Sequence, residues 1–69
     1  MTMKNLGDAL PDAIARVTKI LGYYQEIGPA GAFGVMMIKA SLDRATRALA
    51  SGDIAAMLVA MNDLKEYSE

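Results

Sequence analysis

The sequence predicts an all-α fold: a small three-helix domain, made of an antiparallel helical hairpin and an N-terminal helix, that spans residues 1–69 and is oligomeric. Apolar residues recur at spacings of three and four along three segments, and glycine or proline separates these segments. No alternating strand pattern is followed by a turn that could pair it. The helices are expected at residues 9–27, 33–51 and 54–67.

The first helix, residues 9–27, is predicted from an apolar stripe with charged residues between its members. The stripe consists of Leu10, Ala13, Ile14, Val17, Ile20, Leu21, Tyr24 and Ile27. Pro11 is expected in the first turn, because the N–H that proline lacks has no intrahelical partner there. The pair at residues 28–29, glycine then proline, should end the helix. Gly22 is either a tolerated glycine or a point where a second helix crosses closely.

The second and third helices are joined by a turn that the sequence marks clearly. Gly52 is suited to a left-handed C-terminal cap, and Asp53 to the N-cap of the next helix. Because this turn is short, the two helices should be antiparallel neighbours. The predicted core face of the second helix is Val35, Ile38, Leu42, Ala45 and Leu49, and that of the third is Ile54, Met57, Leu58, Met61 and Leu64.

Composition indicates how so short a chain is stabilised. The 69 residues are 54% hydrophobic and include no cysteine and no histidine, so disulfides and the usual structural zinc sites are excluded. We expect no metal and no cofactor. A short chain with this much apolar surface is expected to cover part of it by self-association, as a homo-oligomer.

Charge and hydropathy argue against two classes of partner. Seven basic residues against eight acidic ones leave a net charge of −1, which makes DNA an improbable ligand. The longest charge-free stretch, residues 27–38, is too short to cross a membrane. The first ten residues lack the apolar core of a secretory signal. A cytoplasmic location without membrane contact is expected.

Catalytic chemistry is not expected. Nucleophilic catalysis most often uses a serine, threonine or cysteine beside a histidine or lysine, and two of these residue types are missing from the chain. The eight acidic residues are scattered over the surfaces and ends of the predicted helices, so no pair is expected to converge in a cleft. We therefore predict a binding protein without catalytic residues, not an enzyme.

A second stripe on the second helix carries the main functional hypothesis. It consists of Phe33, Met37, Ala40 and Arg44, with Met36 and Arg47 on its flank. In one interpretation it is a contact with the third helix or a dimer seam without a ligand. In the other, the apolar side chains and the two arginines bind a nucleotide-like anion or a host protein. Arg44 has no acidic residue three or four positions away, so it is either available for a phosphate or simply solvated.

Two further positions are candidates for binding. Tyr23 should face about 100° away from Tyr24, which places it partly in solvent, where it can enter an interface or stack on a base. Gly31 and Gly34, at the opening of the second helix, form a possible anion-binding loop. The alternative is an ordinary loop and a loose first turn, because no strand precedes the segment and no Gly-Lys-Ser/Thr follows it.

Residues 29–53, a Pro-x-Gly opening followed by an alanine-rich helix, resemble the helical-hairpin sponges that sequester cyclic-nucleotide immune signals. These belong to the small helical proteins that bacteriophages encode against host defences. The resemblance implies an oligomer in the host cytoplasm that holds the signal between protomers, with Tyr23, Arg44 and Arg47 in the stacking and basic roles. The segment from Ile54 to Tyr67 has no counterpart in that pattern.

These observations favour a non-catalytic binding protein, a phage or prophage counter-defence protein that sequesters a nucleotide-like signal or blocks a host protein. The alternative is an oligomeric structural or adaptor subunit that binds a partner protein through the second stripe. A helix-turn-helix regulator is disfavoured, because the third helix carries Asp63 and Glu66 where a recognition helix would be basic. Sequestration predicts a basic, partly apolar crevice, whereas the adaptor alternative predicts a stripe that a protein partner covers completely.

Overall fold

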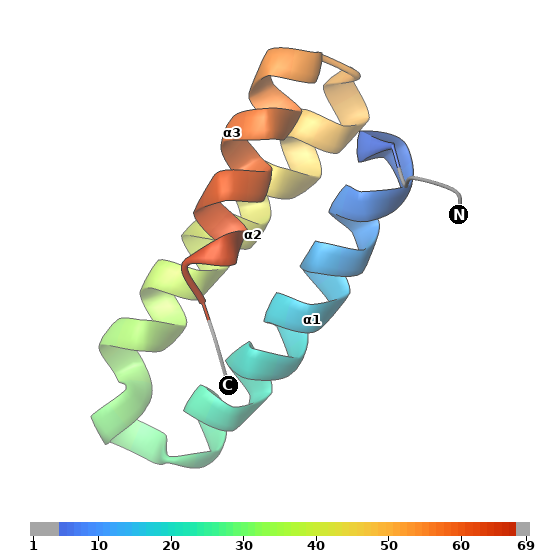
Figure 1. The fold of residues 1–69 in the computed structure, drawn as a ribbon. Helices are drawn as coiled ribbons and strands as arrows, with labels where there is room; N and C mark the ends of the chain where they lie inside the picture. The colour runs from blue at the N-terminus through green and yellow to red at the C-terminus, as the bar shows by residue number, and fades with distance from the viewer. Residues whose placement is uncertain (1–4, 68–69) are drawn as a thin grey trace.

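The computed structural model describes residues 5–67, which form three α-helices and one short 3₁₀ helix (Figure 1). The elements are α1 (Leu6–Glu26), η1 (Gly28–Gly31), α2 (Ala32–Ser51) and α3 (Ile54–Lys65). No strand occurs among the described residues. The predicted all-α class and the three helices are therefore confirmed, and the predicted start of α2 differs by one residue. The third helix ends at Lys65, two residues before the predicted end at residue 67.

The first helix starts earlier than predicted. Asn5 is its N-cap, with a side-chain oxygen that accepts a hydrogen bond from the Asp8 N–H at 3.0 Å. The placement of Pro11 in the first turn was wrong, because this residue lies inside the helix. Proline there removes one intrahelical hydrogen bond. The extra N-terminal turn compensates in part, since it brings Leu6 against the core.

Glycines allow α1 and α2 to approach closely where they are joined. Gly28 has a left-handed backbone, with φ of 70°. A Cβ atom on Gly31 would overlap the carbonyl oxygen of Tyr24, and a Cβ atom on Gly34 would overlap the ring of that tyrosine. In contrast, a Cβ atom on Gly22 would meet nothing within 4 Å, so no helix crosses closely at this glycine.

The turn between α2 and α3 is as predicted. Gly52 has φ of 71° and caps α2, with its N–H directed to the carbonyl oxygens of Ala48 and Leu49. Asp53 is the N-cap of α3, and its side chain accepts hydrogen bonds from the N–H groups of Ala55 and Ala56. The two helices run antiparallel (Figure 1).

The two long helices, α1 and α2, also run antiparallel, and from here on we call this pair the hairpin (Figure 1). The core lies where α3 packs onto it. Its buried members are Leu10, Val17, Ile20, Ile38, Ser41, Ala45, Ala48, Met57, Ala60 and Leu64. All three helices contribute, and the predicted core face of α2 is buried or half-buried throughout. Apolar burial on this scale is the main force that holds the three helices together.

Four residues predicted to lie in the core are exposed: Tyr24, Ile27, Ile54 and Leu58. The first two lie at the end of α1 that α3 does not reach. In α3, the buried face runs through Met57, Ala60 and Leu64. Ile54 and Leu58 lie outside this face and are therefore exposed.

Polar contacts fix the C-terminal end of α3 to both long helices. The Arg16 guanidinium donates from Nη1 to the carbonyl oxygen of Tyr67 at 2.7 Å and from Nη2 to that of Leu64 at 2.8 Å. The Tyr67 hydroxyl lies 2.8 Å from the Oγ atom of buried Ser41 and donates to the Met37 carbonyl oxygen at 3.3 Å. The Arg16 bonds satisfy carbonyl groups at the C-terminal end of α3, where the last carbonyls of a helix lack intrahelical partners.

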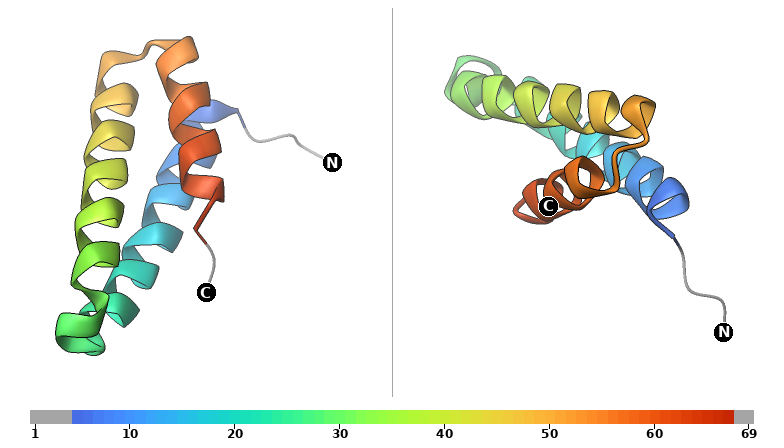
Figure 2. Two further views of the ribbon diagram at one scale, coloured as in Figure 1. Left: turned by 90° about the vertical axis from the view of Figure 1, so that its left-hand side faces the viewer. Right: turned by 90° about the horizontal axis from the view of Figure 1, so that it is seen from above.

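The third helix is much shorter than the helices it packs on. It has 12 residues, whereas α1 has 21 and α2 has 20. Figures 1 and 2 show α3 beside the end of the hairpin where α1 begins and α2 ends. We call the opposite end, where η1 joins α1 to α2, the tip. The side of the hairpin that α3 covers is therefore left uncovered at the tip.

We predict that Gly22→Ala stabilises the protein by about 0.5 to 1 kcal/mol, because alanine restricts the unfolded chain and its methyl group meets open space. Gly31→Ala should destabilise it by about 1 to 3 kcal/mol, because its methyl group would displace the end of α1. Urea unfolding at one fixed protein concentration measures both. Equal stability of the two variants would contradict this account of the tip.

Tyr67→Phe should lower the free energy of unfolding by about 1 kcal/mol, because the ring is kept while the hydroxyl bonds to Ser41 and Met37 are lost. Tyr23→Phe is the matched control, with both variants measured at a sub-micromolar protein concentration, since that ring is exposed in the tip of a single copy. Thermal or urea unfolding of the two variants should separate them. If both lose the same stability, the hydroxyl contacts do not anchor α3.

Candidate functional site

The residues predicted to bind a ligand or partner lie in two places. The apolar ones lie at the tip, whereas Arg44 and Arg47 lie beside a groove between α2 and α3. The structure does not bring Tyr23 and the two arginines together within one chain, because Tyr23 lies at the tip, whereas the arginines lie in the half of α2 that lines the groove with α3. The sequence analysis grouped these residues in one binding hypothesis, whereas the structure places them on two separate surfaces.

The first surface, which we call the tip surface, consists of Tyr23, Tyr24, Ile27, Phe33 and Met37. These side chains are 37% to 67% exposed. Tyr23 and Ile27 follow Arg16 by about two and three helical turns, so they share its side of α1. Met37 and Phe33 precede Arg44 by the same intervals on α2. Because both arginines contact α3, the tip surface continues the side of the hairpin that α3 covers.

The remaining candidates at the tip have plainer structural roles. Met36 is exposed, about a quarter turn from Met37 on α2, and extends the apolar surface outward. Gly31 and Gly34 lie against Ile27 and Tyr24, so close packing accounts for both glycines without a bound anion. The anion-binding loop stays a prediction that this geometry does not favour.

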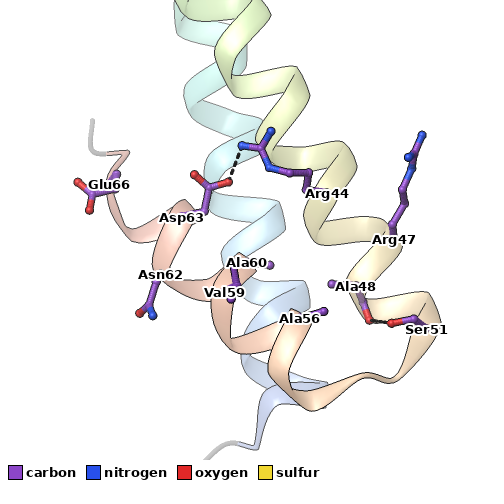
Figure 3. A pocket seen from close by; sticks show the side chains of 10 residues that line it. All are labelled: Arg44, Arg47, Ala48, Ser51, Ala56, Val59, Ala60, Asn62, Asp63 and Glu66. Atoms are coloured by element: carbon purple, nitrogen blue, oxygen red, sulfur yellow. Dashed lines mark hydrogen bonds and ion pairs between the residues drawn. The ribbon is translucent and has the colours of Figure 1, made fainter.

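The second surface is an open groove of about 920 Å³ between α2 and α3 (Figure 3). Its lining consists of Arg44, Arg47, Ala48 and Ser51 from α2, and Ala56, Val59, Ala60, Asn62, Asp63 and Glu66 from α3. Alanines form its floor, and their small side chains leave the space open. Sequence reasoning identified the two arginines of the α2 wall from the second stripe. It missed the rest of that wall and the whole α3 wall, because only the packing of the two helices creates the groove.

The two arginines are not equivalent. Arg44 is directed across the groove, and its Nη2 atom lies 2.9 Å from Asp63 Oδ2 (Figure 3). The same nitrogen atom lies 3.1 Å from Ser41 Oγ. Arg47 extends away from α3 and pairs with Asp43, one helical turn before it, at 3.1 Å. Arg44 has no acidic residue three or four positions away on α2, but it is not unpaired as expected, because Asp63 of α3 is its partner.

The charges of the groove are divided between its walls. Arg44 and Arg47 line the α2 wall, and Asp63 and Glu66 line the α3 wall. The groove within one chain is therefore of mixed charge, whereas sequestration predicts a basic, partly apolar crevice. Both ion pairs are solvent-exposed, and such pairs stabilise a fold by only about 0 to 1 kcal/mol. A ligand that offers a better partner to each wall could displace them.

Metal ligands, serine hydroxyls and the length of the helices bear on other kinds of site within residues 5–67. No group of three or more Asp, Glu, His or Cys side chains in this range could hold a metal ion. Ser41 is buried and bonded to Tyr67, and Ser51 donates to the Ala48 carbonyl oxygen at 2.8 Å and accepts from the Asp53 N–H. None of the helices described is long and apolar enough to span a bilayer.

Comparison of the chain with protein-family models, with curated proteins and with solved structures finds no match. No family is therefore assigned. The groove and the tip surface carry the functional argument on their own geometry.

Proposed function

We propose that this protein is a non-catalytic, homo-oligomeric binding protein that holds a nucleotide-like anion in the groove between α2 and α3. The observation that carries the proposal is the arrangement of the groove: one wall carries arginines, the other carries carboxylates, and an alanine floor separates them. Pockets of this size, with an apolar lining and a few polar groups, are typical of small-molecule sites.

The two walls suit two different parts of a nucleotide. A phosphate accepts paired hydrogen bonds from a guanidinium group, so it would lie along Arg44 and Arg47. The amino groups of a base are donors, which Asp63 and Glu66 can accept, and the Asn62 amide can both donate and accept. Val59 and the alanines would contact the flat base. An inorganic anion would use the α2 wall alone and bind more weakly.

The resemblance of residues 29–53 to phage sponges supports sequestration as the role of such binding. A sponge lowers the concentration of a signal by stoichiometric binding and needs no catalytic group. We therefore propose a counter-defence protein of phage or prophage origin, acting in the host cytoplasm.

A second candidate function is that of a structural or adaptor subunit that binds a protein. Exposure of the second stripe favours it, because Phe33, Met36 and Met37 are all uncovered at the tip. In this alternative a host or phage protein covers these side chains and the groove has no small ligand.

We predict that Arg44→Gln/Arg47→Gln lowers affinity for adenine cyclic mono- and dinucleotides at least about tenfold, because charge-assisted hydrogen bonds to the phosphates are lost. Lys19→Gln/Lys39→Gln is the matched control, since it removes the same charge from exposed positions outside the groove. Calorimetric titration measures affinity, and pyrophosphate serves as the probe without a base. The thermal midpoint should change little in either variant.

Native mass spectrometry of the protein purified from its host gives an independent test, since it reports the oligomer and any retained small molecule together. A retained nucleotide supports sequestration. Unchanged nucleotide affinity in the double arginine variant, or pyrophosphate binding as tightly as nucleotides, contradicts the proposed groove chemistry. Absence of nucleotide binding together with a co-purifying protein favours the adaptor alternative.

A further inference from the structure

We propose that a second copy of this chain covers the tip surface, and that the two copies pack antiparallel about a two-fold axis. The inference rests on the homo-oligomeric part of the proposed function and is independent of the groove ligand.

The apolar area of the tip surface matches what a homodimer needs. Its five side chains are about half exposed on average, and side chains of this size present about 200 Å² each, so the surface offers roughly 500 Å². A standard interface buries about 800 Å² per partner, and in homodimers about 65% of it is apolar, or roughly 520 Å². The tip surface is also at the upper end of what a monomer exposes in one patch.

Charge favours a second copy over a different partner. Residues 27–38, which contribute three of the five tip side chains, include no charged residue. The five tip side chains are themselves all uncharged, so the surface that they form is best matched by another apolar surface. A second tip surface supplies one of equal size, and a two-fold axis makes the match reciprocal.

The position of α3 fixes the orientation of the copies. This helix covers the side of the hairpin that bears Arg16 and Arg44, which bond to Leu64 and Asp63. Figure 2 shows that α3 stops short of the tip. In a parallel pair, the two α3 helices would collide before the tips met. In an antiparallel pair, each tip points toward the α3 end of the other copy. Phe33 of one copy then faces Met37 of the other, a favourable contact between an aromatic ring and sulfur.

Sedimentation equilibrium over the micromolar range tests whether a second copy of the chain covers the tip surface. Phe33→Asp should weaken self-association at least about tenfold, because it places an unpaired charge in a central apolar contact. It should leave helicity unchanged, because aspartate is favourable near the start of a helix. Leu58→Asp is the matched control: it makes the same change at an exposed leucine of α3, away from the tip, and should associate like the unmodified protein.

A monomer of 7.4 kDa across that range would overturn both the dimer and the homo-oligomeric part of the proposed function. Equal association of the two aspartate variants would overturn the tip interface alone. If Phe33→Asp lost helicity as a dilute monomer, Phe33 would belong to the core of one copy, and this would also overturn the proposal.

A distance measurement between two spin labels tests the relative orientation of the two copies and leaves the tip surface unchanged. The chain has no cysteine, so Ala50→Cys gives one spin-label site per copy on an exposed position of α2. This position lies about 22 Å along the helix from the middle of the tip surface, so antiparallel copies place the labels about 45 Å apart. A parallel pair would hold them within about 30 Å. A short distance in a confirmed dimer would overturn the antiparallel arrangement while leaving homo-oligomerisation intact.

Discussion

The length of α3 constrains the whole molecule. At 1.5 Å per residue, a helix of 12 residues covers about 18 Å of a hairpin whose helices extend about 30 Å. Apolar side chains under α3 are buried and form the core, whereas those on the same side of the hairpin beyond its end are exposed. The tip surface therefore results from an incomplete third layer, and a chain of this size has no other element among its described residues to complete it.

The contacts that hold the C-terminal end of α3 also shape the groove. Arg16 and the Ser41–Tyr67 pair hold its C-terminal end against both long helices. Arg44 connects this anchor to the groove, because one nitrogen atom lies near both Ser41 and Asp63. A phosphate bound to Arg44 would compete with Asp63. Ligand binding would therefore exchange one weak exposed ion pair for contacts with both walls, with little effect on the Arg16 and Tyr67 contacts that anchor α3.

Local signals in the sequence were sufficient for much of the fold. Gly52 and Asp53 determine their turn through backbone conformation and capping, which depend on neighbouring residues alone. The exposed second stripe was also predictable, because helical periodicity separates it from the core face. The start of α1 was not: Pro11 is a common first-turn residue, and its signal outweighed that of Asn5.

Tertiary features were beyond reach of the sequence for a different reason. The Arg44–Asp63 pair and the α3 wall of the groove depend on how two helices are set against each other. The exposure of Tyr24 and Ile27 depends on where α3 ends, although their spacing is that of core residues. Gly31 and Gly34 suggested a phosphate loop, while packing against α1 explains them, because a glycine needed for close approach has the same sequence signature.

Hydrogen exchange at residue resolution, measured over a range of protein concentrations, tests most directly whether the uncovered end of the hairpin drives association. Amides at the tip, residues 21–38, should exchange more slowly as concentration rises, because a second copy restrains local opening there. Amides of α3 should show much less change. Exchange at the tip that is independent of concentration would contradict the account, since it would mean that the tip surface stays open to solvent.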